Sequence, residues 1–96
     1  MLVIFRTGGG DWERFRTTLR ENEQLIRDMG CTRIEAYRNR KHPDEWVMLQ
    51  DWPDKARFDE FAREQGPELD RLAGVRWTDV STWLDSALQP TGAISP

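Results

Sequence analysis

The first candidates for chemistry are polar side chains at positions where the sequence predicts strands: Arg6, Tyr37, Asn39, Asp79 and Ser81. Any of them that points into a cavity could hydrogen-bond a phenol or a ketone. Arg6 would act most strongly, because its fixed charge could stabilise an enolate. The alternative for Arg6, at a strand end, is a surface ion pair with a carboxylate.

Residue types that usually carry nucleophilic, acid–base or phosphate chemistry are sparse. The only histidine, His42, could serve as a general base, but a histidine in a polar turn is more often simply solvated. Cys31 has no histidine beside it in the sequence and fits a small buried apolar side chain. The run Gly-Gly-Gly-Asp at residues 8–11 lacks the ending of a phosphate-binding loop and fits a flexible turn. No Cys, His, Asp or Glu cluster has metal-ligand spacing, so we expect no metal and no cofactor.

Length and composition narrow the function class. The 96 residues make one domain, and a net charge of −3 gives no basic surface for nucleic acid. No apolar run approaches the roughly 20 residues of a membrane span, and the first residues lack a signal peptide's features. A single cysteine excludes an internal disulfide, so we expect a protein of the reducing cytoplasm.

Hydrophobic periodicity predicts alternating helices and strands. Apolar residues at helical spacing predict a helix over 11–29, with Asp11 as its N-cap. Strands are expected over 2–7, 31–40, 45–52 and 75–84. A second helix opens at Asp54 and breaks at Gly66-Pro67, and a short third helix ends near residue 74. We expect the domain to span 1–88 and residues 89–96 to form a flexible tail.

The order strand, helix, strand, strand, helix, strand predicts an α+β fold of the ferredoxin-like, split βαβ type. Its four-stranded antiparallel sheet carries both helices on one face. The strand hairpin over residues 30–52 is apolar on both faces, so the open face must meet a ligand or a partner subunit. We expect two such sheets to pack face to face in a homodimer. Apolar residues that could share that face are Val3, Phe5, Val47, Leu49, Val80 and Leu84.

Several local features together point to a family. They are Gly30-Cys31 entering the second strand, Tyr37-Arg38 near its end, Pro43-Asp44 in the hairpin, the segment Trp46 to Trp52, and the helix opening at Asp54. With these features, residues 1–88 resemble the antibiotic-biosynthesis monooxygenase-like superfamily of dimeric α/β barrels.

The resemblance implies a substrate cavity inside each subunit, between the helices and the sheet. It suggests that a small aromatic ligand is held there. Candidates for the cavity wall are Tyr37, Trp52, Phe58, Phe61, Leu69, Trp77 and Trp83, with Arg6 as a polar group that could reach in. For the tryptophans, packing in the core or at a dimer interface is the competing interpretation.

The chain departs from the family at its histidine. Many members carry one in or after the second helix, where this chain has only Phe58 to Gln65. Haem-degrading members need a histidine ligand, and the matching position falls near Asp70, with Phe61 where they have a tryptophan. We therefore do not expect haem degradation.

Three functions remain open. The first is a cofactor-independent monooxygenase acting on a bulky aromatic or polyketide-like substrate. The second is a non-catalytic dimeric ligand-binding or accessory domain, which the missing histidine favours. The third is a polyketide cyclase of the same fold, which would need no oxygen.

Overall fold

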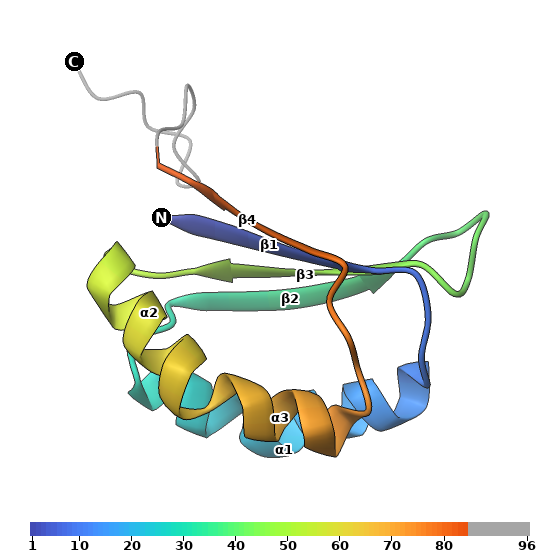
Figure 1. Cartoon of the computed structure of the whole chain (residues 1–96), viewed down its shortest axis with the longest axis horizontal. Helices are drawn as coiled ribbons and strands as arrows, with labels where there is room; N and C mark the ends of the chain where they lie inside the picture. Colours follow the sequence, from blue (N-terminus) through green and yellow to red (C-terminus); the bar gives the residue numbers. More distant parts are fainter. Residues whose placement is uncertain (85–96) are drawn as a thin grey trace.

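The computed structural model describes residues 1–84 (Figure 1). Its elements, in chain order, are β1 (Leu2–Thr7), α1 (Trp12–Asp28), β2 (Arg33–Arg38), β3 (Trp46–Asp51), α2 (Lys55–Glu64), α3 (Gly66–Ala73) and β4 (Asp79–Trp83). The predicted domain end at residue 88 and the predicted tail at 89–96 lie outside the described residues.

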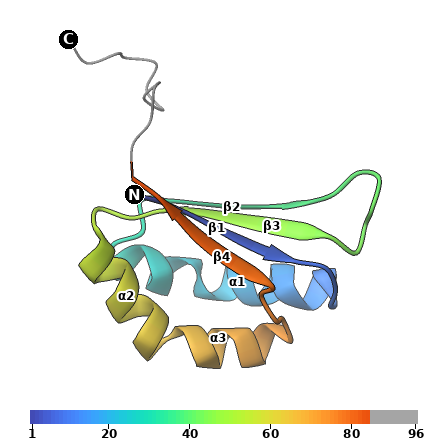
Figure 2. The same ribbon diagram turned by 45° about the horizontal axis from the view of Figure 1, so that its top comes forward.

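The four strands form one antiparallel sheet in the order β2-β3-β1-β4. All three helices lie against one face of this sheet, and its other face is left bare by residues 1–84 (Figures 1 and 2). The predicted α+β, ferredoxin-like fold is therefore confirmed.

The helices begin and end where the sequence provides the chemistry for it. The side chains of Asp11 and Asp54 each accept a hydrogen bond from a backbone N–H three residues on, at 3.1 and 2.9 Å, and so cap α1 and α2. Helix α2 ends at Glu64, and α3 starts with Gly66 and Pro67. Gly74 ends α3 with a φ of 64°, a left-handed conformation that glycine adopts without a Cβ penalty.

Strand register corrects one expectation about the sheet faces. On β1, Val3 pairs with Gln50 and Phe5 with Met48, and all four side chains are buried on the helix side. Val80 pairs with Phe5 and faces the same way. The expectation that Val3, Phe5 and Val80 lie on the open face is therefore wrong.

The residues that do occupy the open face follow from the same register. They are Leu2, Ile4 and Arg6 of β1, Val47, Leu49 and Asp51 of β3, Arg33, Glu35 and Tyr37 of β2, and Asp79, Ser81 and Trp83 of β4. Opposed residues of antiparallel strands share a face, so this set is fixed by pairing alone.

An aromatic cluster fills the space between sheet and helices. Phe15 of α1 stacks at a tilt on Trp46, with ring centroids 4.8 Å apart. Phe58 of α2 lies edge-on to Phe5 at 6.1 Å. These contacts hold α1 and α2 against the sheet, and aromatic pairs in such geometries stabilise beyond their buried area. Within residues 1–84, no helix is both long and apolar enough to cross a membrane.

Candidate functional site

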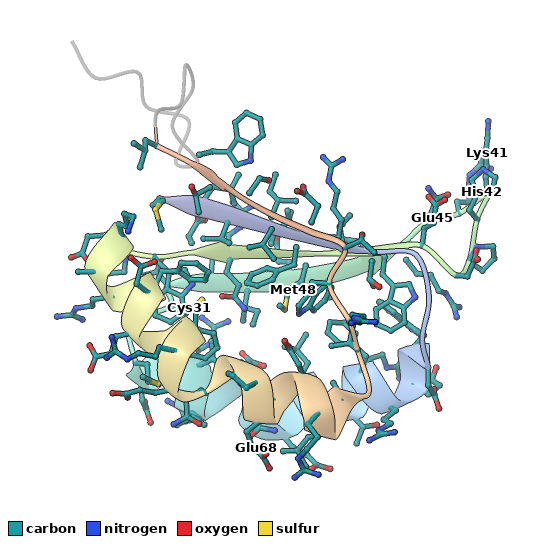
Figure 3. All side chains as sticks on the ribbon, in the orientation of Figure 1. Cys31, Lys41, His42, Glu45, Met48 and Glu68 are labelled. Atoms are coloured by element: carbon teal, nitrogen blue, oxygen red, sulfur yellow. The ribbon has the colours of Figure 1, made fainter. Side chains whose placement is uncertain are left out.

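A cavity of about 340 Å³ lies between the helices and the sheet. Its wall is made mainly of apolar side chains from all three helices and from β1, β3 and β4. The larger of them are Phe5, Phe15, Ile26, Met48, Phe58, Phe61, Leu69 and Trp77. Figure 3 shows Met48 in this space, below the sheet and above α3. The volume falls in the range of small-molecule sites, and an apolar wall with a few polar groups is their usual character.

Polar side chains interrupt the apolar wall at four positions: Thr18 and Asn22 on α1, Gln50 on β3 and Asp70 on α3. Asn22 Nδ2 donates to the Thr18 carbonyl at 2.8 Å, so part of this pair is committed to the helix itself. Of the four, only Gln50 is fully buried, and Asp70 is the only one that carries a charge.

Asp70 is a half-buried carboxyl group held by one hydrogen bond. Its Oδ1 accepts from the indole Nε1 of Trp77 at 3.1 Å. Burial raises the pKa of Asp70 above its ordinary 3.8, and the Trp77 hydrogen bond only partly opposes this. A carboxylate with a raised pKa in an apolar cavity is a stronger base than a solvated one, so Asp70 can accept a proton from a bound ligand.

Gln50 is the second polar group that deserves a place in the site, because its amide is entirely enclosed. Its Oε1 accepts from Trp52 Nε1 at 2.8 Å, while its Nε2 lies 3.5 Å from the sulfur of Met48. An amide in apolar surroundings is costly unless its hydrogen bonds are satisfied. It therefore adds a directed polar group to the sheet side of the cavity.

Four of the predicted wall residues line this cavity: Phe58 and Phe61 on α2, Leu69 on α3, and Trp77 just before β4. Trp77 reaches the cavity because β4 starts only at Asp79, later than predicted, and the preceding residues run irregularly between α3 and the sheet. Its ring lies 5.3 Å from that of Phe5.

The other four predicted residues lie elsewhere. Arg6 and Tyr37 are on the open-face side of the sheet and line a separate hollow of about 490 Å³ near the β2–β3 hairpin. Trp52 is buried behind the cavity, stacked on Phe61 at 5.0 Å. Trp83 is 54% exposed on the open face, where its Nε1 donates to Ser81. These four do not line the cavity, because strand alternation or a neighbouring ring separates them from it.

The two residues of the types that most often act as general base or nucleophile, His42 and Cys31, lie outside the cavity. His42 sits at the tip of the β2–β3 hairpin, away from the helices (Figure 3). Cys31 is buried, its thiol lies 3.1 Å from the Arg33 carbonyl, and burial raises its pKa above 9.0. A neutral, enclosed thiol is a poor nucleophile. Within residues 1–84, no group of three or more His, Cys, Asp or Glu residues could hold a metal ion.

Sequence reasoning missed Gln50 and Asp70 as site residues. The signal for Gln50 was present in the sequence. Gln50 shares one face with Trp46, Met48 and Trp52 at every second residue, and it is the polar member of that set. Asp70 gave a weaker signal: it is an acid of the short helix α3 that lies between Leu69 and Ala73, both of which line the cavity.

The sequence matches the family model described as antibiotic biosynthesis monooxygenase over residues 3–68. This range includes β1 through the start of α3. No protein with a curated function matches the chain.

Solved structures of similar fold come from several bacteria. A candidate antibiotic biosynthesis monooxygenase from Bordetella bronchiseptica superposes with a TM-score of 0.68 at 14% identity, covering 86% of this chain and 95% of its own. Rv0793 from Mycobacterium tuberculosis gives 0.65 at 20% identity, with 90% and 96% covered. SnoaB, a cofactor-independent oxygenase from Streptomyces nogalater, gives 0.66 at 18% identity, with 88% and 93% covered. At these identities the likeness establishes the shared fold.

Proposed function

This chain belongs to the antibiotic biosynthesis monooxygenase family, and from that premise we propose that it is a cofactor-independent monooxygenase. Its substrate would be a bulky aromatic or polyketide-like compound bound in the cavity between helices and sheet. The observation that carries the proposal is Asp70, a carboxyl of raised pKa and the one charged group that residues 1–84 contribute to the wall of a mainly apolar cavity. The fold shared with SnoaB, itself a cofactor-independent oxygenase, supports the same assignment.

The proposed reaction uses the substrate as its own reductant. The carboxylate of Asp70 takes a proton from an acidic CH₂ group that is flanked by aryl rings, which leaves a carbanion delocalised into the rings. The carbanion transfers one electron to O₂, and the resulting substrate radical and superoxide combine in a C–O bond. The peroxide takes up the proton and loses water to leave a ketone. In sum, CH₂ and O₂ give C=O and H₂O, without an outside electron donor.

The protein's part in this reaction is to bind, orient and remove a proton. The apolar wall favours a planar aromatic body and excludes water, which would otherwise solvate the carbanion. The Trp77 indole fixes one oxygen of Asp70, so the other oxygen is left to meet the substrate.

Oxygen consumption by purified protein with anthrone as substrate tests the proposal. We expect turnover above the spontaneous rate, and an Asp70→Asn variant about 10²–10⁴-fold slower. Asp44→Asn, an exposed carboxyl in the hairpin turn, is the matched control and should retain full activity. A wild-type rate no higher than the spontaneous rate with a panel of anthrones and dihydroxynaphthalenes would overturn the proposal.

A polyketide cyclase is the second candidate, and the same carboxyl favours it, since Asp70 could deprotonate a carbon for ring closure as well. The two reactions differ in their need for oxygen. A cyclase forms its product at an unchanged rate under nitrogen, whereas a monooxygenase forms none. Ligand binding without turnover, both in air and under nitrogen, would favour a ligand-binding domain.

We also propose that the protein is a homodimer joined through its open sheet face. Ile4, Val47 and Leu49 form an apolar strip there, and Tyr37 and Trp83 are more than half exposed beside it. Contiguous apolar residues on an uncovered sheet face are typical of a surface that contacts a partner. A cytoplasmic location is part of the same proposal, supported by the free thiol of the only cysteine.

A further inference from the structure

The buried amide of Gln50 has a hydrogen-bonding capacity that the fold does not use. Gln50 sits in the middle of the sheet, opposite Val3 on β1 and Ile34 on β2, and is only 1% exposed. Its neighbours in the chain on the same face are Met48 of β3 and Trp52, the residue that follows this strand. An apolar side chain would fill this place without the desolvation cost that an amide carries.

The orientation of the amide is fixed by chemistry. An indole N–H can only donate, so the atom 2.8 Å from Trp52 Nε1 must be the amide oxygen. The amide nitrogen is thereby turned to the other side. Its two hydrogens have one partner among residues 1–84, the sulfur of Met48 at 3.5 Å, which is a weak acceptor.

Gln50 and Met48 both line the cavity, so the side chain that carries the under-used nitrogen is part of the wall that a ligand would touch. Phe5, Phe58 and Phe61 supply apolar wall on the sheet and α2 and offer no acceptor for it. A buried donor left without a strong acceptor costs free energy that a ligand oxygen can recover.

From this arrangement we propose that Gln50 is a specificity-determining residue whose amide N–H binds a carbonyl or phenolate oxygen of the ligand. The inference rests on the proposed function and narrows its substrate class. The preferred compound carries an acceptor oxygen for Gln50 on the sheet side and an acidic proton for Asp70 on the α3 side. An aromatic hydrocarbon of the same shape that lacks the oxygen is discriminated against. In the reaction, the N–H also stabilises the negative charge that passes onto that oxygen when the carbanion forms.

Two probes of nearly the same shape separate this role from simple packing. Anthrone carries a carbonyl group, and 9,10-dihydroanthracene replaces it with CH₂. Both are titrated by calorimetry under nitrogen, so that binding is measured without oxidation. The quantity of interest is the ratio of their dissociation constants in each variant, because differences in probe hydrophobicity cancel between variants.

The variants are chosen so that the indole N–H of Trp52 is never left without an acceptor. Gln50→Met alone would strand the indole N–H of Trp52. The comparison is therefore between Trp52→Phe, which keeps the amide, and Trp52→Phe combined with Gln50→Met, which removes it. We expect loss of the amide to lower the preference for anthrone about 2- to 10-fold, with little change for dihydroanthracene. An unchanged ratio would overturn the proposal, as would failure of both probes to bind the wild type.

The infrared carbonyl band of bound anthrone gives a second measurement that needs no stable double variant. A hydrogen bond from Gln50 lowers the stretching frequency relative to anthrone in an apolar solvent, and Asp70→Asn leaves this shift in place. A band at the apolar-solvent position in the wild type contradicts the inference.

The experiments also keep the two proposals apart. A preference for anthrone that depends on Gln50, without oxygen consumption, supports the recognition role of Gln50 and contradicts the proposed monooxygenase activity. Oxygen consumption that depends on Asp70, with an unchanged probe ratio, does the reverse.

Discussion

At the scale of single residues, the carboxyl of Asp70 gives the proposed enzyme a characteristic pH dependence. Proton abstraction needs the carboxylate, and burial raises the pKa of Asp70. The rate constant kcat for anthrone oxidation should therefore fall as pH decreases through this raised pKa, which lies at a higher pH than the pKa of a solvated aspartate. A pH–rate profile checks this, and an acid limb that persists in whatever activity Asp70→Asn retains would assign the titration to another group.

The same carboxyl predicts a change in stability. In the folded state burial raises the pKa of Asp70 above its ordinary 3.8. The stability that this group contributes is therefore complete below pH 3.8 and is lost as pH rises through the folded-state pKa. Asp70→Asn keeps an acceptor for Trp77 and has no charge to bury. We expect the variant to unfold at higher urea concentration than the wild type near neutral pH, with the difference vanishing below about pH 4. A difference independent of pH would contradict this account.

Residue types alone could not have located these two site groups. Arg6 and Tyr37 looked more reactive than Gln50, yet pairing places them on the far side of the sheet. Strand alternation gives the relative face of two residues, but which face meets the helices depends on packing. For Asp70, the decisive facts are its burial and its bond to Trp77, a residue that reaches it through an irregular segment.

At the scale of elements, the N-cap of α2 stabilises a helix that forms part of the cavity wall. Asp54 accepts from the Arg57 N–H at 2.9 Å, and α2 carries Phe58 and Phe61 into the wall. Asp54→Ala should lower the free energy of unfolding by about 1 kcal/mol, measured by urea denaturation. Glu60→Ala, an exposed position of the same helix, serves as control and should change stability by less than about 0.5 kcal/mol.

Element types and helix starts followed well from the sequence, because Asp11, Asp54 and Pro67 act locally through caps and a missing donor. The orientation of β1 did not follow. Leu2 and Ile4 are as apolar as Val3 and Phe5, so period-two alternation carries no information about which pair faces the helices. Only pairing with Gln50 and Met48 decides it.

At the scale of the whole molecule, the proposed dimer depends on the open face of the sheet. Leu49→Glu places a charge in the middle of that face, where a partner sheet would bury it unpaired. We expect the dissociation constant of the dimer, measured by analytical ultracentrifugation, to rise by about 10²-fold or more. Leu25→Glu makes the same chemical change at an exposed position of α1 and should leave the dimer intact. A wild-type protein that sediments as a monomer would remove the proposal.

The order of elements was enough to predict the whole fold, since few topologies bury one face of four strands under helices joined in this sequence. The cavity was different. Its volume is what remains after Trp46 and Trp52 have packed fully against Phe15, Phe58 and Phe61, and that remainder depends on side-chain conformations rather than on composition.

The placement of the tryptophans has a practical consequence for spectroscopy. Trp77 lies on the cavity wall and Trp83 on the open face, while Trp46 and Trp52 are shielded from solvent. A ligand in the cavity should therefore perturb the emission of Trp77, and a partner sheet should protect Trp83 from a soluble quencher such as acrylamide. The protein thus contains separate intrinsic fluorophores for its two proposed interactions. Replacing Trp77 or Trp83 by Phe would assign each optical signal to its surface.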